Sequence, residues 1–315
     1  MGSRLVKNTR IFRVGTRKSP LALAQTKEAL AIFKKKFPNL IFRIVPLLTE
    51  GDEFQSVEIF KRGGEGVFTK GVEKELLARR IDLAVHSLKD LPTTLTKGLA
   101  LAAVLKRADT SDALVTKKRL SLGQLPVGAK VGTGSLRRKE QLRRLRPDLQ
   151  IEVLRGNLDT RVRKVIQTGQ LDAVVLATAG LTRLKSFSKY SRKIPQEMIL
   201  PAVGQGAIAL QARVTDRRAL AVAASANHRP TELAVRAERA FLEELHGGCR
   251  VPIGVLTKIG NKKIRVKGAI FSVGTNQTLS AACGGPSDKP EKVGRALAKK
   301  LLQKGAAKLL ERARA

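Results

Sequence analysis

The feature that most constrains the fold is an alternation of short apolar runs with helical segments, which occurs twice in the first two thirds of the chain. In the first copy, an apolar run is followed by Ser19, a good helix cap, and Pro20, which suits the first helical turn. Strand, helix, strand, helix, strand is the signature of an α/β layered fold. We therefore predict strands at 11–14, 41–47, 81–85, 99–105 and 113–116, and helices at 20–37 and 68–80.

The alternation starts again at Val127, so a second α/β unit resembles the first. Its predicted elements are strands at 127–133, 151–154 and 171–177, a helix after Ser135 and another at 159–168. The segment 201–210 combines turn residues with an apolar strand, which suits a crossing back into the first unit.

The pattern changes at about Asn227. We predict a helix to His246, strands at 251–259, 263–272 and 278–282, and a final basic helix from Pro290. This is a smaller α+β domain. A chain of 315 residues exceeds one core of ordinary size, and the predicted domains are 9–105 with 206–224, then 111–200, then 227–315.

The charge balance is extreme, with 61 Lys and Arg against 26 Asp and Glu and a formal net charge of +35. Such a field attracts nucleic acid, anionic membrane or a polycarboxylate substrate. Alternatively, most of the excess is a solvated basic surface. Only 3% of the residues are aromatic, which argues against base stacking. No specific nucleic-acid partner and no membrane partner are predicted.

The bulk composition also limits location and metal chemistry. No apolar run approaches the roughly 18 to 20 residues that span a bilayer, and the start shows no secretory signal. Two cysteines are too few for a disulfide framework, so we predict a reducing, cytoplasmic location. The three histidines are scattered, and no metal site is predicted.

Three predicted helix starts share one design, an arginine beside a small turn rich in hydrogen-bond donors. Free backbone N–H groups and the helix dipole make each start an anion site, and arginine can hold a carboxylate through two hydrogen bonds. Three such sites at strand ends in two similar domains indicate a polyanionic ligand between them. Their residues are Arg17 with Ser19; Ser135 with Arg137 and Arg138; and Arg155 with Asn157 and Arg161.

Two further residues are candidates for chemistry. Cys249 follows two glycines and precedes Arg250, a setting that favours the reactive thiolate; alternatively, it is a small packing residue in a tight turn. Asp90 follows a strand directly, where a carboxylate could exchange a proton or steady a cation while Lys89 holds a substrate acid. Alternatively, Asp90 is a turn residue before Pro92. For His86 we favour a structural role.

Taken in order, six motifs resemble those of the porphobilinogen deaminases, also called hydroxymethylbilane synthases. The match runs from about residue 10 into the C-terminal domain, and six motifs in the right order at the right spacing are very specific. They are 15–22 (GTRKSPLA), 85–92 (VHSLKDLP), 132–138 (GTGSLRR), 155–157 (RGN), 200–206 (LPAVGQG) and 247–249 (GGC).

The resemblance implies two domains like type II periplasmic binding proteins, with a cleft between them, and a third domain. It implies a monomeric transferase that joins four porphobilinogens head to tail with loss of ammonia, giving hydroxymethylbilane. The chain grows on a dipyrromethane cofactor attached to Cys249 through a thioether. Asp90 is then the catalytic residue, which protonates the leaving amine and stabilises cationic intermediates.

The resemblance also implies which residues bind carboxylates. Those predicted to hold the cofactor, besides Cys249 and Asp90, are Lys89, Ser135, Arg137, Arg138 and Arg161. Those predicted to bind substrate are Arg17, Ser19, Gln25, Phe68, Arg155 and Gln205. The stretch 107–112 lacks the family's usual proline, which predicts a looser crossover between the first two domains.

Two other functions remain as alternatives at this point. A non-catalytic binding protein of the periplasmic type for anionic ligands would share the two α/β domains. The missing signal segment and the third domain with its thiol disfavour it. A nucleic-acid-binding protein is supported by net charge alone.

Overall fold

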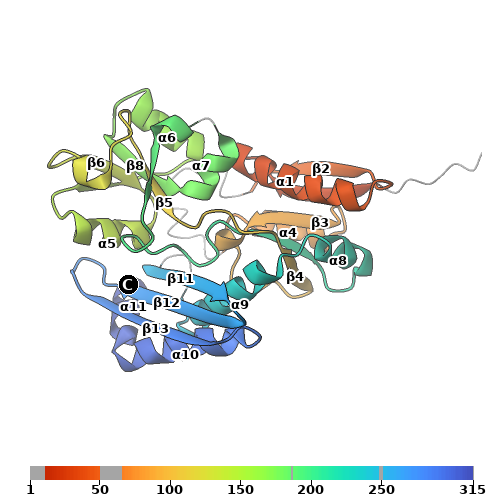
Figure 1. Cartoon of the computed structure of the whole chain (residues 1–315). Coiled ribbons are helices and arrows are strands. Elements are labelled where there is room, and N and C mark those ends of the chain that lie inside the picture. Colours follow the sequence, from red (N-terminus) through yellow and green to blue (C-terminus); the bar gives the residue numbers. More distant parts are fainter. Residues whose placement is uncertain (1–10, 50–65, 186, 248–250, 315) are drawn as a thin grey trace, which may run out of the picture.

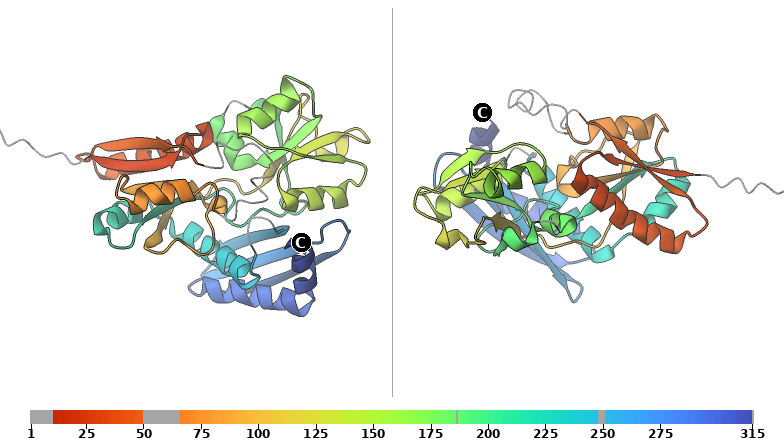
Figure 2. Two further views of the ribbon diagram at one scale, coloured as in Figure 1. Left: turned by 180° about the vertical axis from the view of Figure 1, so that it is seen from behind. Right: turned by 90° about the horizontal axis from the view of Figure 1, so that it is seen from above.

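The structure is a computed structural model that describes residues 11–49, 66–185, 187–247 and 251–314. Three separate sheets organise these residues (Figure 1). Two sheets have five strands each, and the third has three. Figure 2 shows the third sheet and its helices packed as a separate layer against the other two units.

The first sheet has the strand order β2-β1-β3-β10-β4. Strand β1 pairs in parallel with both of its neighbours, whereas β10 runs antiparallel to β3 and β4 because it returns from the second unit. Its strands are β1 (Phe12–Arg17), β2 (Phe42–Leu47), β3 (Leu83–Ser87), β4 (Leu99–Val104) and β10 (Ile208–Arg213). Its helices are α1 (Pro20–Lys36), α4 (Lys70–Leu77), α8 (Arg217–Ala224) and the 3-10 helix η1 (Leu88–Asp90).

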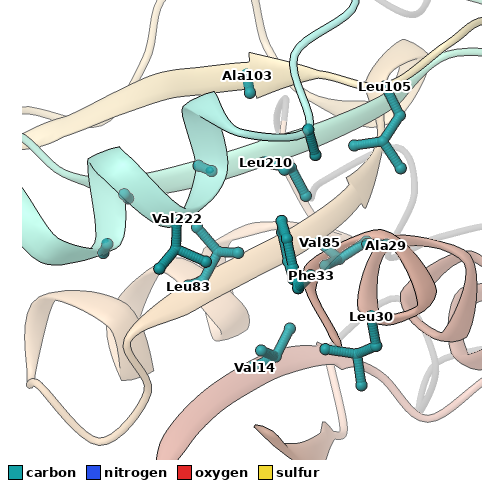
Figure 3. Packing of buried hydrophobic residues seen from close by; sticks show 14 of the residues in the cluster. Val14, Ala29, Leu30, Phe33, Leu83, Val85, Ala103, Leu105, Leu210 and Val222 are labelled. Atoms are coloured by element: carbon teal, nitrogen blue, oxygen red, sulfur yellow. The ribbon is translucent and has the colours of Figure 1, made fainter. Parts of the chain in front are cut away.

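One face of this sheet packs against α1 and α8 and forms its main apolar core (Figure 3). Phe33 from α1 and Val14 from β1 are fully buried there, together with Leu83 and Leu210. Complete burial of one such side chain contributes roughly 1.5–3 kcal/mol. The core fixes the sheet, so the carboxyl ends of β1 and β3 are held side by side.

The second sheet repeats this arrangement with the order β7-β6-β8-β5-β9. Strand β6 is parallel to both neighbours, and β5 is the antiparallel strand that enters from the first unit. Its strands are β5 (Asp112–Val115), β6 (Lys130–Thr133), β7 (Gln150–Val153), β8 (Ala173–Ala177) and β9 (Ser191–Ile194). Its helices are α5 (Leu136–Leu145), α6 (Leu158–Ile166), α7 (Thr178–Leu184) and the 3-10 helices η2 (Leu122–Gln124) and η3 (Ser188–Tyr190).

Two crossovers join these units, 105–111 on the way out and 195–207 on the way back. The Ala108 amide donates to the Gly206 carbonyl at 3.2 Å. Gly206 has φ +85°, and a Cβ there would lie 2.7 Å from the Ala108 carbonyl oxygen, so only glycine suits this close approach. The looser crossover expected from the missing proline stays a prediction, since a hydrogen bond between the two segments does not measure it.

The third sheet, β11-β12-β13, is antiparallel throughout. Phe241, Val266 and Leu297 are fully buried in the core that the helices form with this sheet. The elements are β11 (Ile253–Gly260), β12 (Lys263–Phe271), β13 (Thr278–Pro286), α9 (Arg229–Glu244), α10 (Pro290–Gln303) and α11 (Ala306–Arg314).

The predicted fold class, two α/β units and a smaller α+β unit, is confirmed. Among the elements of the described residues, the α-helices α7, α8 and α11, the strand β9 and the three 3-10 helices were not predicted. Thr178–Gly180, directly after the carboxyl end of β8, begins α7. In the part of the chain that the structure describes, no helix is long and apolar enough to cross a membrane.

Candidate active site between the two α/β units

Asp90 and Lys89 lie on η1, directly after the carboxyl end of β3. The flanking Leu88 and Leu91 are 2% and 4% exposed, and they anchor this turn in an apolar cluster. Lys89 and Asp90 themselves are half-buried. Burial lowers the pKa of Lys89, the Asp90 carboxylate opposes that shift, and the charge of Arg138 adds to it. The η1 turn therefore places a cation and a carboxylate within electrostatic reach of Arg138 in the second unit.

Four predicted substrate residues, Arg17, Ser19, Gln25 and Phe68, lie where β1 leads into α1 or contact residues there. Ser19 caps α1 by accepting from the Ala22 amide at 3.3 Å, as predicted. The Gln25 amide nitrogen donates to the Ser87 hydroxyl at 2.9 Å, which ties α1 to the residue before η1. The Arg17 guanidinium lies 4.2 Å from the centroid of the Phe68 ring, a cation–π contact that orients both side chains.

In the second unit, Ser135 caps α5, and the two arginines that follow are buried, Arg137 being 4% and Arg138 5% exposed. Both turn toward Asp112. The Arg137 Nη1 atom lies 2.8 Å from Asp112 Oδ2, and Arg138 donates to Asp112 Oδ1 through Nη2 at 2.7 Å and Nε at 3.0 Å. Burial alone would raise the pKa of Asp112, but the two arginine charges outweigh it and hold that pKa well below its usual range.

Arg161 on α6 and Arg155 before it lie near Arg138, and we call these arginines together with Arg137 the cationic wall. Arg161 Nε donates to the Gly156 carbonyl at 2.8 Å. Burial, followed by repulsion from Arg138 and Arg155, lowers the pKa of Arg161 to about 10, and attraction to Asp90 only partly offsets this. Cations from the second unit therefore crowd one another and face the carboxylate from the first.

Gln205, predicted to bind substrate, lies fully buried on the return crossover. Its Nε2 atom donates to the Thr110 carbonyl at 2.6 Å and to Asp112 Oδ1 at 3.0 Å. Gln205 thus contacts Asp112, the carboxylate that pairs with Arg137 and Arg138.

His86 occupies the structural position favoured from the sequence. It is 5% exposed, and its Nε2 atom hydrogen bonds with the Gln211 side chain at 3.0 Å. Burial lowers the pKa of His86, so the ring is neutral at ordinary pH.

Cys249, the predicted cofactor anchor, lies outside the described residues. The chain is described up to Gly247, three residues beyond the end of α9, and again from Val251. Among the residues that the structure describes, no three His, Cys, Asp or Glu side chains gather to hold a metal ion.

Comparison with known proteins decides the family. A model described as "Porphobilinogen deaminase, dipyromethane cofactor binding domain" matches residues 12–221, and one described as "Porphobilinogen deaminase, C-terminal domain" matches 232–303. The chain belongs to the porphobilinogen deaminase family. The porphobilinogen deaminase of Moorella thermoacetica is 45% identical over 304 residues, 96% of this chain and 97% of that protein. That of Desulforudis audaxviator is 43% identical over 302 residues, 96% of this chain and 97% of that protein.

Family membership confirms the predicted activity in tetrapyrrole synthesis and the predicted dipyrromethane cofactor, and it does not favour the binding-protein or nucleic-acid alternatives.

Among solved structures, the periplasmic VFT2 domain of Bordetella pertussis BvgS gives a TM-score of 0.39 at 16% identity, over 69% of this chain and 86% of that one. The substrate binding protein of an amino acid ABC transporter also gives 0.39, at 15% identity, over 75% and 98%. These likenesses are too distant to add to the assignment.

The site contains one residue that the sequence analysis did not select, Asp112. Its sequence context, DALV at the start of an apolar run, reads as an ordinary strand. Its partners Arg138 and Gln205 are 26 and 93 residues away, so only the folded chain shows them together.

Proposed function

We propose that this chain joins porphobilinogen units with Asp90 as the catalytic residue and a wall of cations as the binding surface. One observation carries the proposal: within the described residues, six cations gather near the carboxylates of Asp90 and Asp112 and outnumber these two by four. Two linked pyrroles, each with two carboxylates, would balance that surplus. The cations are Arg17, Lys89, Arg137, Arg138, Arg155 and Arg161.

The residues present therefore fit a dipyrromethane. Lys89, Arg137, Arg138 and Arg161 would hold its carboxylates, with Ser135 and the α5 N-terminus adding hydrogen-bond donors. Cys249 would carry it through a thioether. When bound, the dipyrromethane supplies the pyrrole end to which substrate units are joined.

Asp90 is the carboxylate in a position to act on the arriving substrate. It follows β3 on a turn that Leu88 and Leu91 anchor in an apolar cluster with β4, β10 and α9, so the backbone at Asp90 is held against the first sheet. A carboxylate there can exchange a proton with the substrate amine, which leaves as ammonia. It can also offset the positive charge that develops on the ring.

The arriving porphobilinogen would meet the residues at the start of α1. Arg17 is set against the Phe68 ring, so its guanidinium can pair with a carboxylate while the ring excludes water. Ser19 and Arg155 supply further donors. Gln25 would support the substrate site by holding Ser87, and Gln205 would support it by holding the two crossovers together.

We further propose that the protein works as a cytoplasmic monomer without a specific nucleic-acid partner. The scattered exposed lysines and arginines and the scarcity of aromatic residues support the last point, because sequence-independent attraction needs only charge.

The test is Asp90→Asn, with Asp288→Asn as a matched control in an exposed turn of the third unit. We expect Asp90→Asn to keep the far-ultraviolet circular dichroism and the covalent adduct while porphobilinogen consumption falls at least about 100-fold, the lower range for loss of a general acid or base. Asp90→Glu should recover part of the rate. Unimpaired turnover in Asp90→Asn would remove Asp90 from the catalytic role, and loss of turnover in Asp288→Asn would show that the assay reports damage rather than chemistry.

A further inference from the structure

Asp112 is the most completely enclosed carboxylate near the site. It is the first residue of β5, directly after the outgoing crossover, and it is 0% exposed. Its Oδ1 atom accepts hydrogen bonds from Arg138 and from Gln205, and its Oδ2 atom faces Arg137. Among the described residues, the printed partners of its carboxylate thus come from the start of α5 and from the return crossover.

The charge of Asp112 sets what the arginine pair can bind. Two guanidiniums on successive residues of α5, both buried, would repel each other and lack water. One carboxylate between them cancels one of the two charges and leaves one. The pair is thereby left able to hold a single further carboxylate at a buried site.

Asp112 also fixes the direction of both guanidiniums. Arg138 is held at its Nη2 and Nε atoms by Asp112 and at Nη1 by the Val175 carbonyl at 3.1 Å. Arg137 is held at Nη1 by Asp112 and by the Leu200 carbonyl at 2.5 Å. Within the described residues, the buried Arg137 Nε atom makes no hydrogen bond, so it is a donor left for a ligand.

The same carboxylate joins the arginines to the connection between the two α/β units. Gln205, from the return crossover, bridges Asp112 Oδ1 and the Thr110 carbonyl of the outgoing crossover. The two crossovers also meet at Ala108 and Gly206. A change in the angle between the units would therefore reach the arginine pair through the Asp112 side chain.

We propose that Asp112 is a positioning residue for cofactor attachment: it aligns Arg137 and Arg138 to hold a cofactor carboxylate and ties that alignment to both crossovers. This inference rests on the proposed function. Asp112 touches the arginines and Gln205, and its effect passes through them.

The experiment compares Asp112→Asn, Asp112→Glu and a matched control, Asp82→Asn. Asp82 lies directly before β3, whereas Asp90 follows the other end of the same strand. Asp82 also faces two arginines, Arg13 at 3.0 Å and Arg213 at 3.9 Å. Intact mass gives the fraction of each purified protein that carries the adduct, thermal unfolding gives its stability, and steady-state kinetics gives kcat and KM.

For Asp112→Asn we expect the adduct-bearing fraction to fall at least about 10-fold below wild type, whereas Asp82→Asn loses stability but keeps the adduct. Asp112→Glu retains the charge but shifts the carboxylate oxygens, so this variant should keep the adduct. Its kcat should be at least about 5-fold lower than that of wild type, whereas its KM should stay within about 2-fold of wild type. Asp112→Asn with a wild-type adduct fraction overturns the inference. If Asp112→Asn does not fold, Asp112→Glu decides, and wild-type kcat in that variant overturns the inference. A wild-type protein with no adduct and no porphobilinogen consumption refutes the proposed function instead.

Discussion

The buried ion pair between Arg107 and Glu238 offers a quantitative test of how the crossovers are anchored to the third unit. Arg107 lies on the outgoing crossover, and its Nη1 and Nη2 atoms donate to the two carboxylate oxygens of Glu238 on α9 at 2.6 and 2.9 Å. The Glu238 side chain is 1% exposed and also accepts from the Gly204 amide at 2.8 Å. One side-chain pair thus holds both crossovers against α9.

We predict that Arg107→Met destabilises the protein by about 3–5 kcal/mol, because it leaves the Glu238 charge buried without its partner. At roughly 2–4 °C per kcal/mol for a domain of this size, the melting temperature should fall by roughly 6–20 °C. In Arg107→Met with Glu238→Leu, apolar groups of similar volume replace both charges, so most of the loss should be recovered.

Urea and thermal unfolding of the wild type, both single variants and the double variant form a complete cycle. The exposed pair Arg229 and Glu232, on the same helix, provides the control, since breaking it should cost at most about 1 kcal/mol. A loss below about 1 kcal/mol in Arg107→Met, or a double variant as unstable as the two single variants summed, would refute the reasoning.

Three further predictions concern the site and its scaffold. Burial and the neighbouring cations lower the pKa of Arg161 from the usual 12.5 to about 10, so the charged fraction of its side chain should decrease as the pH rises through about 10. The KM for porphobilinogen should therefore rise more steeply between about pH 9 and 11 in wild type than in Arg161→Gln, and parallel profiles would contradict this. Gly206→Ala should cost at least about 1 kcal/mol in urea unfolding, since its φ is +85° and the Ala108 carbonyl blocks a Cβ; a neutral effect would contradict the close approach. Ser19→Ala should cost about 1 kcal/mol by loss of the α1 cap, whereas an unchanged midpoint would show that the cap is not used.

The sequence was informative where local chemistry decides structure. The Ser19-Pro20 start fixes α1 at Pro20, and the predicted end at 37 lies one residue beyond the observed Lys36. The missed strand β9 has the sequence SRKI, which lacks the apolar alternation of a strand, and its pairing with β5 comes from the fold. The missed helix α8 is short and rich in alanine, so its large apolar residues are too few to show a helical period.

The site residues likewise fall into those that local sequence motifs indicate and those that only tertiary contacts reveal. Asp90, Lys89 and the arginine-bearing helix starts sit in local motifs, so they could be selected from the sequence. Asp112 could not, because its role comes from side chains that meet only when both crossovers are in place. Buried contacts between distant segments depend on tertiary packing, which a local pattern does not encode.

The covalent anchor is the central claim, and the intact mass of the purified protein tests it most directly. We predict that the wild-type chain is heavier than its sequence by the mass of two linked pyrroles and that Cys249→Ser has the mass of the sequence alone. Cys283→Ser, the other cysteine, serves as the control and should keep the excess. A wild-type mass equal to that of the sequence, or an excess that survives Cys249→Ser, would contradict the account.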